Sequence, residues 1–165
     1  MTGAEQLIEQ APNFSRDEFP GDVLRHMDPA VIAALVEIRQ TAGVAIYPSP
    51  VYGAHVRHDS SGSRHSTHGG TRKSDATDCF VAWSDWWTLW PVIQRASAVG
   101  GIGLYTEMHF RGDDMGQWAM FHIDCRPKRI VWLGYRDDAG DSLSYIYEAR
   151  EPRRYYSELA ERVKA

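Results

Sequence analysis

The sequence is poor in cysteine, lacks a long hydrophobic run and carries no strong excess of one charge. Its two cysteines among 165 residues, Cys79 and Cys125, are too few for a disulfide scaffold or a four-thiolate zinc knuckle. No apolar stretch approaches about eighteen residues, so we expect no membrane span, and nothing at the start of the chain predicts a signal peptide. The net charge of -4 gives no electrostatic reason to expect nucleic acid or an anionic membrane as partner.

What the sequence does contain predicts one globular domain. Hydrophobic residues make up 43% of the chain and aromatic residues 12%, which is enough at this length to form one core without staples. No internal repeat or low-complexity tract divides the chain. We therefore expect a single domain over residues 1–165, monomeric and synthesised in a cytoplasm.

Helices are predicted in five places. Ser15 and Glu18 have the spacing of a capping box, and Asp28 and Pro29 are typical of a helix start. We expect a short helix within 1–11, one turn after Ser15, and longer helices over 29–43, from a cap at Ser84 to about 100, and over 153–164 with Tyr156, Leu159 and Val163 on one side. The tryptophans of the fourth helix are interpreted as core residues rather than as a sugar-binding surface.

Strands are predicted where apolar residues alternate or run continuously. These segments are 44–47, 77–82, 102–105, 118–125, 130–135 and 143–147. Turn segments rich in Gly and Asp separate several of them, which favours antiparallel pairing. The fold class expected is therefore α+β, with a central and mostly antiparallel sheet flanked by helices.

Two polar segments contain the residues of a possible metal site. A loop rich in Gly, Ser and Thr holds His65, His68, Asp75 and Asp78 and leads into the strand 77–82, and His122 lies in the later strand 118–125. Two imidazoles and one carboxylate are a common ligand set for catalytic zinc, which keeps its fourth position open for water. Ligands on strands would make such a site rigid, although a single loop histidine is more often solvated than a ligand.

The order of short motifs along the chain resembles a known family. The motifs are Ser63-x-His65, Ala76-x-Asp78, Gly101-Ile102-Gly103-x-Tyr105 and Phe121-His122-x-Asp124-x-Arg126. They resemble the zinc D-alanyl-D-alanine carboxypeptidases and L-alanyl-D-glutamate endopeptidases, which include phage endolysins and vancomycin-resistance dipeptidases. The resemblance covers residues 14–126. It implies the hedgehog/D-Ala-D-Ala peptidase fold, Zn²⁺ held by His65, Asp78 and His122, and hydrolysis of a peptide bond beside a D-amino acid in the peptidoglycan stem peptide.

The spacing of the first two ligands departs from the family pattern. His65 and Asp78 are thirteen residues apart, which is more than the family's usual separation, whereas His68 and Asp75 have the short spacing. We prefer the outer pair, because Asp78 has the Ala-x-Asp context and leads directly into a strand. The additional residues are interpreted as an insertion.

The family's general base is also missing from its usual position. Many members place an acid three residues before the last histidine, where this chain has Ala119. Asp124, which shares a strand face with His122, and Glu107 are the remaining candidates for the catalytic base. For Asp124 the alternative is a role in orienting a ligand or an arginine.

The substrate-binding arginine of the family has no direct counterpart either. Its Ser-Gly-Tyr-Arg segment is absent, and Arg57 is the nearest replacement, because a guanidinium group suits a carboxylate. We expect Arg57 and Ser63 to bind substrate, although a solvated loop arginine is an equal alternative for Arg57.

Strand alternation also makes a prediction about the cysteines. If Asp78 and His122 face the metal, Cys79 and Cys125 point to the other face of the sheet. We expect them there as neighbouring, free and buried thiols.

Two other functional classes remain open. One is a catalytically inactive relative that binds metal and peptidoglycan, for instance as a virion component, which Ala119 makes credible. The other is a globular protein whose histidines are incidental. An active, phage-encoded enzyme without a signal peptide would reach the wall through host lysis or in a virion, and a recycling enzyme would act on imported wall peptides.

Overall fold

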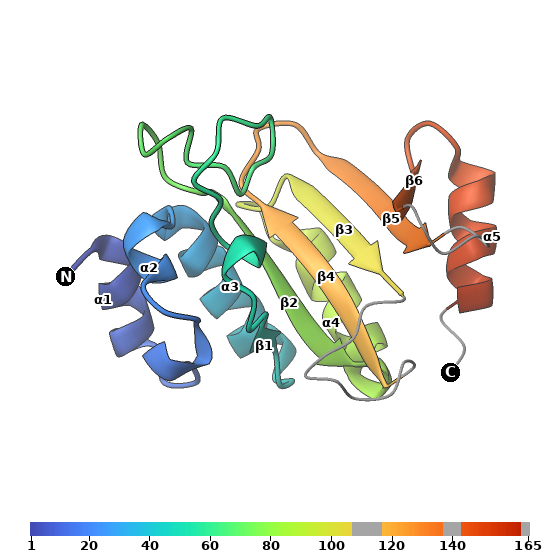
Figure 1. Ribbon diagram of the computed structural model, residues 1–165. Coiled ribbons are helices and arrows are strands. Elements are labelled where there is room, and N and C mark those ends of the chain that lie inside the picture. Colours follow the sequence, from blue (N-terminus) through green and yellow to red (C-terminus); the bar gives the residue numbers. More distant parts are fainter. Residues whose placement is uncertain (107–116, 137–142, 163–165) are drawn as a thin grey trace.

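A single sheet of six strands forms the centre of the protein, and helices lie behind it and at both ends (Figure 1). The computed structural model describes residues 1–106, 117–136 and 143–162. The strands are β1 (Tyr47–Pro48), β2 (Ala76–Ala82), β3 (Gly101–Tyr105), β4 (Trp118–Asp124), β5 (Ile130–Arg136) and β6 (Leu143–Tyr147). The helices are α1 (Gly3–Gln10), α2 (Val23–His26), α3 (Pro29–Ala42), α4 (Trp83–Arg95) and α5 (Pro152–Arg162), with the 3-10 turns η1 (Arg16–Glu18) and η2 (Tyr52–Ala54).

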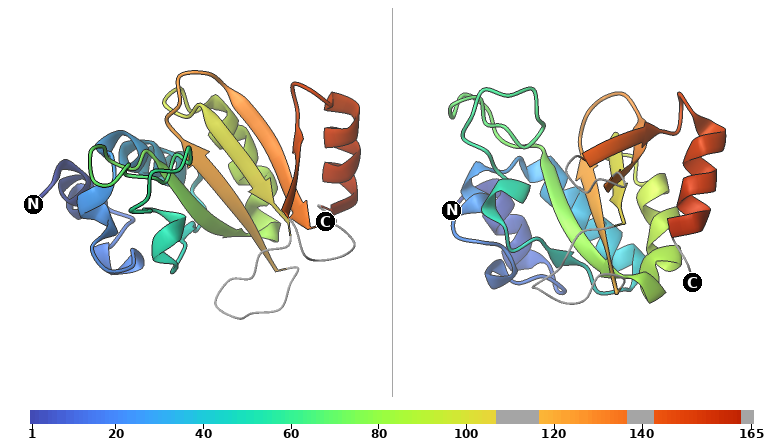
Figure 2. Two further views of the ribbon diagram at one scale, coloured as in Figure 1. Left: turned by 45° about the horizontal axis from the view of Figure 1, so that its top comes forward. Right: turned by 45° about the vertical axis from the view of Figure 1, so that its right-hand side comes forward.

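The strand order is β1-β2-β4-β3-β5-β6. All neighbouring strands pair antiparallel except β3 and β5, which are parallel. Helices α1 to α3 gather beside β1 and β2, whereas α5 packs beside β5 and β6, as the two further views in Figure 2 show. The predicted α+β class with a mostly antiparallel sheet is therefore confirmed.

Helix α3 forms where its end signals predict it. The Asp28 carboxylate accepts a hydrogen bond from the backbone N–H of Ala30 at 2.8 Å, and Pro29 occupies the first turn. Gly43 ends the helix with φ 64°, a left-handed conformation that glycine adopts without steric cost.

Other boundaries were predicted wrongly. The strand expected at 44–47 is reduced to β1, Tyr47–Pro48, and α2 was not predicted. Helix α4 begins at Trp83 rather than after a cap at Ser84, because the Trp83 N–H already donates to the carbonyl of Gln117 at 3.0 Å. The helix ends at Arg95, short of the expected stop.

The C-terminal helix α5 buries Leu159 as expected, but Tyr155 rather than Tyr156 faces inward beside it. Its buried residues are Tyr155 and Leu159, whereas Tyr156 is 53% exposed and Val163 lies outside the described residues. A rotation of one residue moves a helical position by about 100°, so Tyr155 takes the inward place that was assigned to Tyr156.

The hydrophobic core lies on the face of the sheet that α3 and α4 cover. Trp86, Leu89 and Ile93 of α4 are fully buried, which confirms the interpretation of this helix as core-forming, although Trp87 is 50% exposed. Phe121 and Ile123 of β4 point into the same core. Because side chains alternate along a strand, their neighbours in sequence face the opposite side, where the polar site lies. None of the described helices is long and apolar enough to cross a bilayer.

Both cysteines are free, as predicted, but they are not neighbours. Cys79 is buried opposite Phe121, whereas Cys125 is half-buried beyond the end of β4 and its N–H bonds the carbonyl of Asp75. Four residues separate the two positions along the strand pair, which corresponds to about 13 Å. Burial raises the pKa of the Cys125 thiol to about 11.

Candidate metal centre

The loop that carries His65 is fixed by hydrogen bonds over its whole length. The backbone N–H of Arg57 donates to the His65 carbonyl at 2.8 Å, and the N–H of Thr67 donates to the Arg57 carbonyl at 2.8 Å. The Arg72 guanidinium donates to the carbonyls of Ser63 and Ser66, both at 2.8 Å. His65 is therefore held in place although it lies on no helix or strand.

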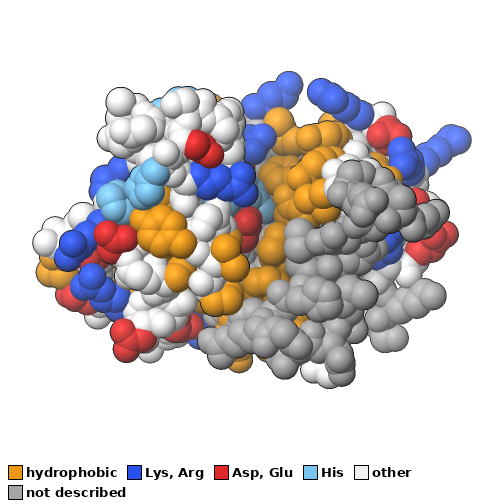
Figure 3. Space-filling model, in the orientation of Figure 1, with side chains coloured by type: hydrophobic (Ala, Val, Ile, Leu, Met, Phe, Trp, Pro, Cys, Tyr) orange, Lys and Arg blue, Asp and Glu red, His pale blue; other side chains and the backbone are white. Residues whose placement is uncertain are grey.

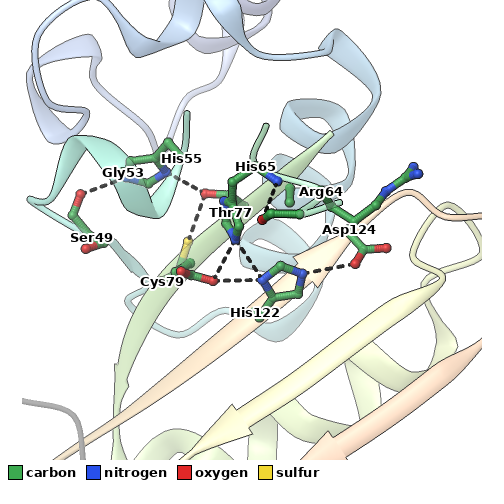
Figure 4. Close-up of polar contacts among 12 residues, drawn as sticks. Ser49, Gly53, His55, Arg64, His65, Thr77, Cys79, His122 and Asp124 are labelled. Carbon is green, nitrogen blue, oxygen red and sulfur yellow. Dashed lines mark hydrogen bonds and ion pairs between the residues drawn. The ribbon is translucent and has the colours of Figure 1, made fainter. Parts of the chain in front are cut away.

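A second set of contacts fixes the base of this loop. His55 is fully buried, and its ring nitrogens contact the Thr77 hydroxyl at 2.8 Å and the Ser49 carbonyl at 2.7 Å (Figure 4). The Ser74 hydroxyl donates to the His55 carbonyl. Because Thr77 precedes Asp78, these bonds connect the loop to the strand that carries the carboxylate.

Three predicted ligands converge at one point. Asp78 of β2 and His122 of β4 are directly paired across the sheet, and the loop brings His65 above them (Figure 4). His122 Nδ1 lies 2.8 Å from Asp78 Oδ1 and 3.2 Å from His65 Nε2, and His65 Nε2 lies 3.5 Å from Asp78 Oδ1. All three residues are at least nine-tenths buried, with exposed fractions of 5%, 9% and 6% for His65, Asp78 and His122.

These separations suit a small tetrahedral cation. Ligand bonds of about 2.0–2.1 Å place neighbouring donor atoms about 3.3 Å apart, within the observed range of 2.8 to 3.5 Å. The donor set of two imidazole nitrogens and one carboxylate oxygen is also the one such an ion prefers. The group of His65, Asp78 and His122 is therefore able to hold a metal ion.

Asp124 orients His122 from the far side of its ring. His122 Nε2 lies 3.0 Å from Asp124 Oδ2, and Asp124 is fully buried. The Arg126 side chain and backbone N–H donate to the same carboxylate, with Nε 2.7 Å from Oδ1. This carboxylate–histidine arrangement leaves Nδ1 of His122 directed at Asp78 and His65, as a metal ligand requires.

The neighbouring charges favour the ionised form of Asp78 and the protonated form of His122. Burial alone would raise the pKa of Asp78, but hydrogen bonds and charge from His122 and His65 hold it well below its usual range. Burial would lower the pKa of His122, and the carboxylates of Asp124 and Asp78 raise it instead. A proton on His122 Nδ1 would form a hydrogen bond to the Asp78 carboxylate. A metal cation and this proton therefore compete for the same nitrogen.

A cavity of about 420 Å³ opens beside the three ligands. Its loop side includes Arg57 and Ser63, both expected to bind substrate. Arg57 is exposed, and its Nε donates to the Gly53 carbonyl at 3.1 Å, whereas the Ser63 hydroxyl accepts from the His65 N–H at 3.3 Å. Ser63 therefore supports the position of His65, and Arg57 leaves most of its guanidinium donors available at the rim.

The shorter-spaced pair of the polar loop lies away from the ligands. His68 is exposed in the left-handed region with φ 48°, and Asp75 forms an ion pair with Arg64. The preference for the outer pair, His65 and Asp78, agrees with this arrangement. Glu107, a candidate base, lies outside the described residues.

Three features of the site were not predicted from the sequence. Trp132 of β5 packs beside His122 with ring centroids 5.1 Å apart, and Tyr145 and Tyr147 of β6 line the cavity. Alternation along each strand identifies which residues share a face, but it does not reveal that β5 lies next to β3 and that β6 lies next to β5.

Comparisons with known proteins identify no relative of this chain. No family model, no curated protein and no solved structure matches the chain.

Proposed function

We propose that the protein is a zinc-dependent peptidase that hydrolyses a peptide bond beside a D-amino acid in bacterial cell-wall peptides. The observation that carries the proposal is the convergence of His65 Nε2, Asp78 Oδ1 and His122 Nδ1 beside an open cavity. The motif order and the mostly antiparallel sheet are consistent with the hedgehog/D-Ala-D-Ala peptidase fold. We further propose a phage-encoded enzyme that meets peptidoglycan after host lysis or in a virion.

The residues of the site would have separate roles in binding the metal, orienting a ligand and binding the substrate. His65, Asp78 and His122 hold the ion, which when bound supplies a Lewis acid and activates water near neutral pH. Asp124 keeps Nε2 of His122 protonated and its ring fixed. Arg57 at the rim offers guanidinium donors to a substrate carboxylate. Asp124 is already bonded to His122 and Arg126, so Glu107 is the candidate for the base.

One observation favours a second candidate function, an inactive relative that binds metal and peptidoglycan. Among the described residues that line the cavity, Asp78 is the only acidic one, and it is a proposed ligand. A catalytic base needs a free carboxylate or similar group within hydrogen-bond reach of the water it activates. The inactive form would bind wall fragments without releasing amino groups.

Digestion of purified peptidoglycan separates the two candidates. We expect the digest to contain new amino groups, and mass spectrometry to detect shortened stem peptides. A chelator should abolish this cleavage, and added zinc should restore it. Glu107→Gln should abolish cleavage while zinc binding persists. Binding of wall fragments without any cleavage by the zinc-loaded protein would favour the inactive relative, and cleavage that persists with a chelator would contradict both.

A further inference from the structure

Among the described residues, three arginines and a single acidic residue line the cavity. The arginines are Arg57, Arg64 and Arg126, and the acid is Asp78, a proposed ligand. Figure 3 shows Lys and Arg side chains along the top of the cleft, beside the hydrophobic side chains over β5 and β6. The chain as a whole carries a net charge of -4, so this concentration of cations is local to the site.

The carboxylates that pair with two of these arginines are not part of the lining. Arg64 forms an ion pair with Asp75, and Arg126 forms one with Asp124, which is fully buried. Together with Asp78, these carboxylates balance the three arginines, so a divalent cation would give the site a surplus of positive charge. A ligand that enters the cavity therefore meets guanidinium groups rather than the carboxylates that pair with them.

Arg126 is bound to Asp124 through only part of its guanidinium group. Nε donates to Asp124 Oδ1 at 2.7 Å and Nη2 donates to Oδ2, whereas Nη1 donates to no atom of the described residues. A guanidinium group has five N–H donors, so the two on Nη1 remain for another acceptor. The Arg126 side chain is 26% exposed and lines the cavity, where a bound ligand would supply that acceptor.

The position of Arg126 is fixed by its surroundings. Its Cζ atom lies 5.4 Å from the centroid of the Trp132 ring, and its backbone packs so closely against Gly100 that a Cβ atom there would collide with the Arg126 carbonyl. The bonds to Asp124 hold the far end of the side chain. A guanidinium group held in this way loses little conformational freedom when it binds an anion.

Arg126 also lies close to the proposed metal ligands. Asp124 connects them, because its Oδ2 accepts from Arg126 Nη2 and lies 3.0 Å from His122 Nε2. Only one carboxylate thus separates the guanidinium group from a ligand ring, so an acidic group a few bonds from the scissile bond would be within its reach. Arg57 belongs to a different part of the cavity, because it is carried by the loop and bonded to Gly53.

We propose that Arg126 binds an ionised carboxylate of the substrate through Nη1, separately from the role assigned to Arg57. This inference rests on the proposed function, because it names the class of stem peptide that the same site accepts. These are peptides whose acidic residue beside the scissile bond is ionised rather than amidated. A carboxylate accepts a charge-assisted hydrogen bond from Arg126, whereas an amide offers only a neutral oxygen and adds N–H donors that the guanidinium group cannot accept.

Two hydroxamates that differ in one group test this assignment without relying on turnover. Succinic acid monohydroxamate and its terminal amide analogue would be titrated by calorimetry into the full chain loaded with zinc. We expect the carboxylate probe to bind roughly tenfold tighter than the amide probe, since hydrogen bonds between charged groups are about twice as strong as neutral ones. Arg126→Gln should remove this preference, whereas a merely structural effect through Asp124 would weaken both probes alike.

Bound zinc would be measured in each variant before the titration. If Arg126→Gln does not retain zinc, Arg126→Lys takes its place, because lysine keeps a cation beside Asp124 but lacks the donors of Nη1. The preference for the carboxylate probe should fall in that variant as well.

Two further variants show which arginine is responsible. Arg57→Gln should leave the preference in place, and so should the matched control Arg153→Gln, which alters an exposed arginine of α5 outside the cavity lining. Equal affinities of the two probes for the native protein, or a preference that survives substitution of Arg126, would overturn the inference while leaving the proposed function standing. Failure of both probes to bind the zinc-loaded native protein would instead overturn the proposed function together with this inference.

Discussion

His122 contacts two carboxylates that have different tasks. Asp78 meets Nδ1 at 2.8 Å and is itself a ligand candidate, whereas Asp124 meets Nε2 at 3.0 Å and is held by Arg126. The second contact fixes which nitrogen carries the proton and increases the basicity of the other. At the scale of single residues, the metal affinity of the site therefore depends on Asp124, a side chain that is not one of the proposed ligands.

Asp124→Asn should weaken metal binding without removing it. An amide can occupy the same space but cannot match the charge that stabilises the imidazole N–H, so we expect a loss of about 10- to 100-fold in zinc affinity. Competition with a chromophoric chelator of known affinity measures this change.

Asp75→Asn is the matched control, because Asp75 also pairs with an arginine, Arg64, but is no part of the ligand group. It should keep the affinity of the native protein. Equal losses in the two variants would show that Asp124 acts only through general stability.

At the scale of elements, β3 makes room for the site through residues that have no side chain. Gly103 lies between His122 and Trp132 in one row across the sheet. Gly101 lies opposite Asp124, and a Cβ atom there would collide with the Asp124 carboxylate. The strand thus brings β4 and β5 together while leaving space for the indole and the carboxylate that surround His122.

Gly103→Ala should disturb the site more than an alanine in a strand normally would. The added methyl group would force the Trp132 ring away from β3, at a cost of about 1–3 kcal/mol in the free energy of unfolding. Urea denaturation and tryptophan fluorescence of the native state measure the loss and the displacement. Gly53→Ala is the control, since no atom lies within 4 Å of its added Cβ, and a similar loss there would contradict this explanation.

At the scale of elements, the sequence was sufficient to predict the metal site but not the aromatic side of the cavity. Ala-x-Asp before an apolar run was sufficient to select Asp78, and alternation placed His122 and Asp124 on one face, as observed. The aromatic side of the cavity was missed because the parallel pairing of β3 with β5 joins segments whose neighbourhood no local pattern encodes. The start of α4 was predicted wrongly for a related reason, since the N–H of its first residue, Trp83, donates to the carbonyl of Gln117, which is distant in sequence.

At the scale of the whole molecule, His55 joins the N-terminal helices, the loop and the sheet. Its ring packs against Phe19 with centroids 5.8 Å apart and contacts Ser49 and Thr77. Burial lowers the pKa of His55 to about 4. The unfolded chain, with an ordinary histidine pKa of about 6.5, therefore binds more protons than the folded protein between these values.

The contribution of His55 to stability should consequently fall as the pH drops below about 6.5, whereas His122, whose pKa is raised, contributes in the opposite direction. For His55 the shift corresponds to a loss of about 2 kcal/mol in the free energy of unfolding between pH 7 and pH 5. Urea denaturation of the metal-free protein at the two pH values measures it. His55→Gln should be less stable at pH 7 but lose less between pH 7 and pH 5, whereas an equal loss in both proteins would assign the effect to other groups.

Metal content tests the ligand assignment most directly. The purified protein would be incubated with zinc, dialysed and analysed for bound metal, beside His122→Ala and the control His68→Ala, which alters an exposed histidine of the same loop region. We predict about one equivalent of zinc in the native protein and in His68→Ala, and less than about a tenth of an equivalent in His122→Ala with its circular dichroism unchanged. No bound zinc in the native protein, or full retention in His122→Ala, would contradict the assignment of His65, Asp78 and His122 as a metal centre.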